Sequence, residues 1–212
     1  MRQVWQWGWV VASVALASCA GGGEAGGDGG APDGGVPRAD AGAAQDAGMA
    51  PDAGLPADGG VAALAVTSSA FVDGGTLPAE FTCDGVGHSP PLAWSGAPAG
   101  TAGYALLMTT EAKDGRKWNW VLYGIAPSTT SLAVGSNGTG TAGKTSDGPQ
   151  LAYAPPCSQG PGEKLYTFTV YALSAAPTFT VPASQVTGPE VTAAVAGITL
   201  AKGALTVGYT RP

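Results

Sequence analysis

The side chains of this 212-residue chain offer few groups that could carry out catalysis. His88 is its single histidine, so neither a site with two histidines nor a cysteine–histidine arrangement with a spare histidine can form. No Gly-x-Ser-x-Gly sequence supplies a nucleophile in the globular part, and a hydrolase would depend on His88 as its base. A lone loop histidine is typically solvated, so His88 is a candidate only for a pocket rim. We therefore predict no enzymatic activity, no metal site and no cofactor.

Cys19 stands in a sequence context that predicts lipidation. An apolar stretch from Val4 to Ala17, too short to span a bilayer, ends in Leu16-Ala17-Ser18-Cys19, which resembles the lipobox of bacterial lipoproteins. Residues 1–18 would be removed as a signal peptide, and acyl chains such as palmitate on Cys19 would anchor the protein to the membrane. Ala20 favours the outer membrane of the cell envelope. The alternative is ordinary secretory cleavage near Ala20, which would discard Cys19.

The acidic character of the chain belongs to its N-terminal third. The net charge is −6; residues 20–60 hold seven acids and one base, whereas residues 61–212 hold eight acids and seven bases. Because no cluster of basic residues exists, the composition excludes a nucleic-acid-binding protein and a polybasic membrane-surface module. Residues 19–60 consist almost wholly of Gly, Ala, Pro and Asp, which cannot form a core, so we predict a disordered tether. Calcium binding by its Asp/Gly repeats is the alternative, but the repeats lack a regular apolar position.

Residues 61–212 have the length and texture of one β-rich domain. Short apolar or alternating runs are separated by Gly, Pro, Ser and Thr, which is typical of strands joined by turns. Residues 189–200 form the one good helix candidate, because proline stands in the first turn and Gly203 follows the end. The pattern predicts a mostly antiparallel β-sandwich with one or two short helices. The candidate strands are residues 64–68, 104–109, 118–125, 165–173 and 204–210.

Several motifs in this domain resemble, in sequence and in order, one protein family. Between about Phe71 and Arg211 the chain is similar to the phosphatidylethanolamine-binding protein family, in its bacterial Raf-kinase-inhibitor-like branch. The resemblance implies a β-sandwich with a small anion-accepting pocket at one end of a sheet. The motifs that carry it are residues 71–78 (FVDGGTLP), 83–94 (CDGVGHSPPLAW), 118–127 (WNWVLYGIAP), 153–157 (YAPPC) and 166–173 (YTFTVYAL).

The pocket positions implied by the resemblance hold altered residues. Thr110, Asn119 and Lys164 stand where the family has an aspartate and two histidines, while Tyr166 is retained. A hydroxyl, an amide and an ammonium can hold an oxyanion but cannot move protons near neutral pH. The alternative is that these are ordinary polar residues at a sheet edge. Asp84 and Pro156 also match family positions, and we include them and His88 among the candidate ligand-binding residues.

Two functions from different classes remain open. The first is a non-enzymatic envelope lipoprotein that binds a small anion, a phosphorylated ligand or a phospholipid headgroup. The second is a protein–protein interaction or inhibitor module with a vestigial pocket and an unknown protein partner. The resemblance also implies that the loops of Cys83 and Cys157 border the same end of the sandwich. An exported protein meets oxidising conditions, so we expect these two cysteines to form a disulfide rather than remain as two separate buried thiols.

Overall fold

The computed structural model describes residues 61–136, 138–147 and 152–212. The predicted signal peptide, Cys19 and the predicted tether lie outside these residues. The described chain contains nine strands, one α-helix and two 3-10 helices, Ala79–Phe81 and Ala183–Gln185. The strands are β1 (Ala62–Ala63), β2 (Ala65–Thr67), β3 (Leu92–Ser95), β4 (Gly103–Ala112), β5 (Gly115–Ile125), β6 (Ser131–Leu132), β7 (Thr141–Ala142), β8 (Lys164–Leu173) and β9 (Thr199–Tyr209), and the helix is α1 (Gly188–Val195).

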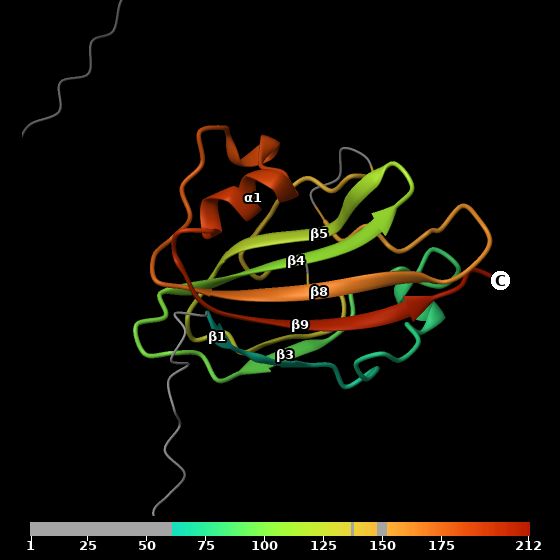
Figure 1. Ribbon diagram of the computed structural model, residues 1–212, viewed down its shortest axis with the longest axis horizontal. Coiled ribbons are helices and arrows are strands. Elements are labelled where there is room, and N and C mark those ends of the chain that lie inside the picture. Colours follow the sequence, from blue (N-terminus) through green and yellow to red (C-terminus); the bar gives the residue numbers. More distant parts are fainter. Residues whose placement is uncertain (1–60, 137, 148–151) are drawn as a thin grey trace, which may run out of the picture. The chain divides into compact units, whose positions relative to one another are not determined.

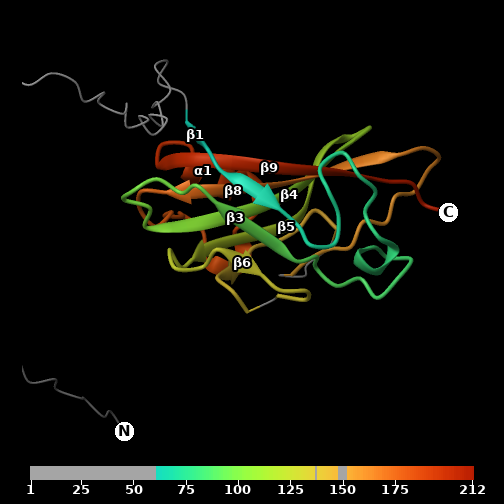
Figure 2. The same cartoon turned by 90° about the horizontal axis from the view of Figure 1, so that it is seen from below.

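The strands form two sheets packed face to face (Figures 1 and 2). The larger sheet has the order β1-β9-β8-β4-β5-β7 and the smaller one the order β2-β3-β6. Every pairing between strands is antiparallel except that of β1 with β9. The predicted mostly β sandwich is therefore confirmed.

Strands β4 and β8 show how the sequence produces the sandwich. On β8, Tyr166, Phe168 and Val170 alternate with half-buried residues, as expected for a strand with one face on the core. On β4 consecutive residues are buried, because Leu106 faces the core between the sheets and Leu107 packs in a second cluster with Val121, Val191 and Val195. Helix α1 covers this second, outer face of the large sheet (Figure 1).

Helix α1 begins where the sequence predicts and ends earlier. Thr187 and Glu190 form a capping box at its start, which satisfies free backbone N–H groups of the first turn. The helix ends at Val195 instead of residue 200. Ala196 is the C-cap, Gly197 after it has a low helix propensity, and Thr199 already pairs with Leu173 in the large sheet. Tertiary pairing therefore overrides the helical pattern.

The free edge of β9 is covered along much of its length. β1 pairs with Ala201 and Lys202. Residues 73–77 run beside the other end of the strand: the N–H of Leu77 donates to the Gly208 carbonyl at 2.8 Å, and the N–H of Thr206 donates to Oδ1 of Asp73 at 2.7 Å. At the opposite edge of the sheet, β5 is followed only by the two-residue strand β7.

Candidate functional site

Four of the residues selected from the sequence line one cavity at an end of the large sheet. This cavity has a volume of about 390 Å³. Thr110, Asn119, Lys164 and Tyr166 all border it, and Cys157 closes one side. The structure thus brings together residues that are up to 56 positions apart in the sequence (166 − 110). We call this space the ligand cavity.

Strand pairing explains why these side chains meet. Thr110 of β4 lies directly opposite Tyr166 of β8, so both side chains point to the same face of the sheet. Asn119 of β5 lies in an irregularity of the β4–β5 pairing: Thr109 pairs with Trp118 and Met108 with Trp120, which leaves Asn119 without a partner on β4. Such a bulge redirects a side chain, and here the side chain is one that lines the cavity.

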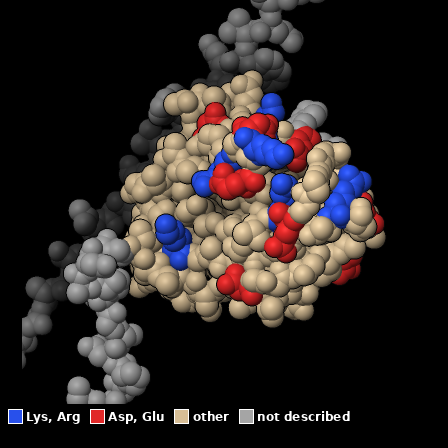
Figure 3. Space-filling model, turned by 45° about the vertical axis from the view of Figure 1, so that its right-hand side comes forward, with Lys and Arg blue, Asp and Glu red and all other residues tan. Residues whose placement is uncertain are grey.

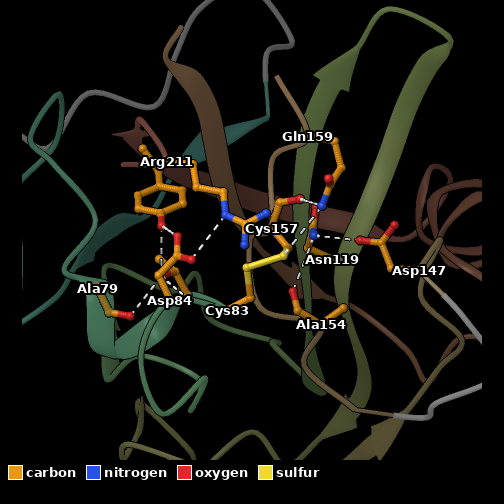
Figure 4. Close-up of a disulfide and its surroundings, with 11 residues drawn as sticks. Ala79, Cys83, Asp84, Asn119, Asp147, Ala154, Cys157, Gln159 and Arg211 are labelled. Atoms are coloured by element: carbon orange, nitrogen blue, oxygen red, sulfur yellow. Dashed lines mark hydrogen bonds and ion pairs between the residues drawn. A yellow bond between two sulfur atoms is a disulfide. The ribbon is translucent and has the colours of Figure 1, made fainter. Parts of the chain in front are cut away.

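Asn119 is held firmly from the side opposite β4. Only 3% of its surface is exposed. Its Nδ2 donates to Oδ2 of Asp147 at 3.2 Å and to the carbonyl of Ala154 at 3.3 Å (Figure 4). Because both partners can only accept, the amide orientation is determined, and Oδ1 is left without a partner among the described residues. Oγ1 of Thr110 is likewise buried without a partner there.

Tyr166 is an uncharged hydrogen-bonding group at neutral pH. Burial, followed by the negative charge of Asp147 and the presence of Tyr209, raises the pKa of Tyr166 to about 12. The phenol therefore keeps its proton and can donate it in a hydrogen bond. A group with such a pKa is unsuited to proton transfer near pH 7.

Apart from Lys164, the charged residues around the cavity were not identified from the sequence. Figure 3 shows acidic and basic side chains interspersed on this end of the molecule. Asp114 and Lys117 form an ion pair at 2.6 Å, and Glu111 pairs with Arg116 at 2.5 Å. Asp147 also lines the cavity. Glu111, Asp114 and Lys117 belong to the β4–β5 hairpin, which follows Thr110 directly in the chain. Extending the pairing of β4 with β5 in the sequence would therefore have located them. No sequence pattern indicated Asp147.

The cysteines of the domain join two loops beside the ligand cavity. Cys83 and Cys157 form a disulfide with a Cα–Cα distance of 5.3 Å, and the N–H of Cys83 donates to the carbonyl of Pro156 at 3.0 Å (Figure 4). Both cysteines are exposed. Residues 158–161, which follow Cys157, form a wall of the cavity, so the disulfide fixes one end of that wall.

Asp84 takes part in a separate network. It accepts hydrogen bonds from the hydroxyl of Tyr209 and from Nε of Arg211, the latter at 3.1 Å. The hydrogen bond from Tyr209 is the main cause that lowers the pKa of Asp84. Partial desolvation opposes the shift, and the contacts with Arg211 add to it. Asp84 lines a shallow depression with Arg211 on the other side of the wall formed by residues 158–161.

Three candidate residues are therefore not brought to the ligand cavity. Asp84 is directed to Tyr209 and Arg211. Pro156 is buried and contributes a backbone carbonyl to Cys83. His88 is exposed in the loop between Phe81 and β3, beside Gly135, and is not among the residues that line the cavity. Its position before Ser89-Pro90 does not predict which loop it faces.

Two further features concern metals and membranes. Within residues 61–136, 138–147 and 152–212, no three His, Cys, Asp or Glu side chains are grouped closely enough to hold a metal ion. None of the helices in the same residues is sufficiently long and apolar to cross a bilayer.

Comparison with known sequences identifies related proteins. The model of the family described as phosphatidylethanolamine-binding protein matches residues 67–210. LppC of Mycobacterium tuberculosis, whose name places it provisionally among lipoproteins, is 37% identical over 115 residues, which are 53% of this chain and 57% of LppC. The chain thus spans little more than half of that relative. A UPF0098 protein of Methanothermobacter thermautotrophicus is 34% identical over 110 residues, covering 49% of this chain and 72% of the relative.

Two solved structures are similar to the domain. One is a protein of Chlamydia trachomatis described provisionally as a homologue of phosphatidylethanolamine-binding protein, with 28% identity and a TM-score of 0.64. The other is YbcL of Escherichia coli, described as a new member of the mammalian family, with 25% identity and a TM-score of 0.64. Each comparison covers 71% of this chain, and 99% and 100% of the respective structures.

Proposed function

Because the chain belongs to the phosphatidylethanolamine-binding protein family, we propose that its domain is a non-enzymatic binding module whose ligand cavity holds a small anionic or phosphorylated group. One observation carries this proposal. Lys164 lines the cavity, is partly buried, and has no ion-pair partner among the described residues. An anionic group of a ligand would supply that partner.

The neighbouring side chains support binding rather than catalysis. The hydroxyl of Tyr166, with its high pKa, and the hydroxyl of Thr110 are neutral donors that can share an oxyanion with Lys164. Among the described residues that line the cavity there is no histidine. A nucleophile would therefore lack the adjacent imidazole base that usually activates it.

Thermal unfolding with and without inorganic phosphate tests the role of Lys164. A ligand at 100 times its dissociation constant should stabilise the domain by roughly 2.7 kcal/mol. Lys164→Ala should abolish this shift, and Tyr166→Phe should weaken binding by about 0.5–1.5 kcal/mol, the contribution of one neutral hydrogen bond. Lys202→Ala is the control, since Lys202 is an exposed β9 residue that does not line the cavity. A phosphate shift that survives in Lys164→Ala would contradict the proposal, and no shift in any variant would favour the interaction module with a vestigial pocket.

We further propose that the protein is a lipoprotein of the bacterial cell envelope, anchored at the outer membrane through acylated Cys19. The sequence Leu16-Ala17-Ser18-Cys19 and the lipoprotein name of the relative LppC support this. Mass spectrometry of the mature N-terminus tests the assignment. An unacylated terminus that begins at any residue other than Cys19 would refute it.

A further inference from the structure

A second cavity, of about 550 Å³, lies on the outer face of the large sheet, and we call it the outer groove. Helix α1 packs on β4 and β5 and leaves the outer face of β8 open among the described residues (Figure 1). On β8, Leu165 is 58% exposed, and Thr167, Thr169 and Tyr171 are half-buried. These four alternate residues point to one face of the strand over about 20 Å. The groove is therefore long enough for an extended ligand.

The floor of the outer groove carries threonine hydroxyls on neighbouring strands. Thr109 of β4 pairs with Thr167 of β8, which pairs in turn with Thr206 of β9. The Oγ1 atoms of Thr167 and Thr206 are 3.0 Å apart. The hydroxyls of Thr109 and Thr169, which line the groove, have no hydrogen-bond partner among the described residues. Each hydroxyl can donate one hydrogen bond and accept two, so the floor has unused capacity in both directions.

Two half-buried aromatic side chains also line the outer groove. Trp118 of β5 pairs with Thr109, and its indole packs so closely on Gly188 that a Cβ atom there would overlap it. Burial raises the pKa of Tyr171, and the positive charge of Arg116 opposes the rise, so the phenol lies within reach of that charge. The phenol therefore stays neutral and can donate a hydrogen bond. The two rings offer apolar surface on which a ligand can stack.

The charges around the outer groove cancel. Two acids and two bases border it: Glu111, Glu163, Arg116 and Lys164. Nε of Arg116 donates to Oε1 of Glu111 at 2.5 Å, and its two Nη atoms make no hydrogen bond among the described residues. The pair can thus still donate to and accept from a polar ligand. Because complementarity of charge favours neither an anion nor a cation here, the groove suits an uncharged ligand.

The composition of the outer groove favours a hydroxyl-rich ligand over a second copy of the chain. Leu165 is the one large apolar residue that is strongly exposed along the groove, within the part of the chain that the structure describes. Interfaces between identical chains are more apolar than this threonine-rich floor. A pyranose ring has C–H faces that stack on aromatic rings and hydroxyls that both donate and accept. A saccharide therefore matches the aromatic rings and the hydroxyls of the groove together.

We propose that the outer groove binds an uncharged, β-linked oligosaccharide. Its rings stack on Trp118 and Tyr171, and its hydroxyls exchange hydrogen bonds with Thr109, Thr167 and Thr169. A β-linked chain of glucose units fits this arrangement, because its equatorial hydroxyls leave C–H groups on both faces of each ring. The groove and the core of the ligand cavity lie on opposite faces of the sheet, so this inference does not depend on the proposed function.

Isothermal titration calorimetry with cellohexaose and chitohexaose, two uncharged β-linked probes, tests the proposal. The native chain should bind at least one of them. Tyr171→Leu, which keeps an apolar side chain but removes the ring, should weaken binding about tenfold. Thr169→Val, which removes one hydroxyl and keeps the β-branched shape, should weaken it about two- to tenfold. Thr210→Val is the control and should bind as the native chain does, because Thr210 is exposed and does not line the groove.

Tryptophan fluorescence locates the bound probe. Trp94 and Trp120 are buried in the core, so binding in the groove should change the emission of Trp118. Trp118→Phe should lose that change and still bind, because phenylalanine keeps an aromatic ring in place.

Three results would overturn the inference. The first is that neither probe binds, or that Tyr171→Leu and Thr169→Val both bind as the native chain does. The second is competition between the probe and inorganic phosphate, which would place the saccharide in the ligand cavity, since Lys164 borders both spaces. The third is a dimer in sedimentation velocity that Tyr171→Leu dissociates, which would make the groove an interface between two copies of the chain.

Discussion

Removal of the Cys83–Cys157 disulfide should lower the free energy of unfolding by about 4 kcal/mol. The two cysteines are 74 residues apart, and in the chain-entropy model a cross-link that closes a loop of this size removes about that much conformational entropy from the unfolded state. Both side chains are exposed, so replacing sulfur by oxygen in a double Cys→Ser variant leaves no core cavity. The backbone hydrogen bond from Cys83 to Pro156 can also remain in the variant. The cross-link itself should therefore account for the difference.

Urea unfolding of the native chain, the native chain with dithiothreitol, and the Cys83→Ser/Cys157→Ser variant measures this difference. The reduced native chain is the control and should behave as the double variant does. The midpoint of thermal unfolding should fall by about 10 °C, given roughly 2–4 °C per kcal/mol for a domain of this size. The denaturant dependence should become steeper, because the unfolded chain without the cross-link exposes more surface. A loss below about 1 kcal/mol would refute the argument, since strain in the native bond would then offset most of the entropic gain.

Two further predictions concern single side chains. The hydrogen bond from Tyr209, ahead of the contacts with Arg211, holds the pKa of Asp84 below its ordinary value of 3.8. The stability that Asp84 contributes is then present above about pH 4 and is lost as the pH falls through the lowered pKa. The difference in urea midpoint between the native chain and Asp84→Asn should accordingly shrink between pH 7 and pH 2.5, and an equal difference at both pH values would contradict the assignment. Gly188→Ala should destabilise the domain by about 1–3 kcal/mol, because the added methyl group would overlap the indole of Trp118. Gly197→Ala, where the methyl group meets nothing within 4 Å, should leave the melting temperature unchanged or slightly higher, and similar losses in both variants would show that the overlap is not the cause.

The long strands of the larger sheet were predictable from the sequence because their patterns are local, whereas β3 and β6 of the smaller sheet were not among the candidate strands. Alternation on β8 and the apolar run on β4 are both properties of consecutive residues. The end of α1 was not predictable in the same way. Residues 196–200 continue a plausible helical composition, but the pairing of Thr199 with Leu173 comes from a distant part of the chain. A pattern of neighbouring residues contains no information about this pairing between distant residues.

For the candidate site too, residues on strands were predictable from the sequence, and residues placed by long-range contacts were not. Thr110, Asn119, Lys164 and Tyr166 lie on the long strands β4, β5 and β8, so positions inferred from motifs on those strands meet in space. Asp147 comes from an irregular segment with no periodic pattern, and its hydrogen bond to Asn119 joins residues 28 positions apart. Asp84 matched a motif, yet its partner Tyr209 lies 125 positions away. The sequence motif identified that carboxylate but not the direction in which it points.

The covered edge of β9 has a consequence for self-association. A long strand with free backbone N–H and C=O groups is a template on which another molecule can extend the sheet. Here β1 and residues 73–77 occupy most of that template, and β1 lies ahead of the residues that match the family model. Residues 61–77 thus protect the edge of β9 from pairing with a strand of another molecule. A fragment that begins at residue 67 would expose the first part of β9, around Ala201 and Lys202, to other molecules, and dynamic light scattering would detect the resulting oligomers.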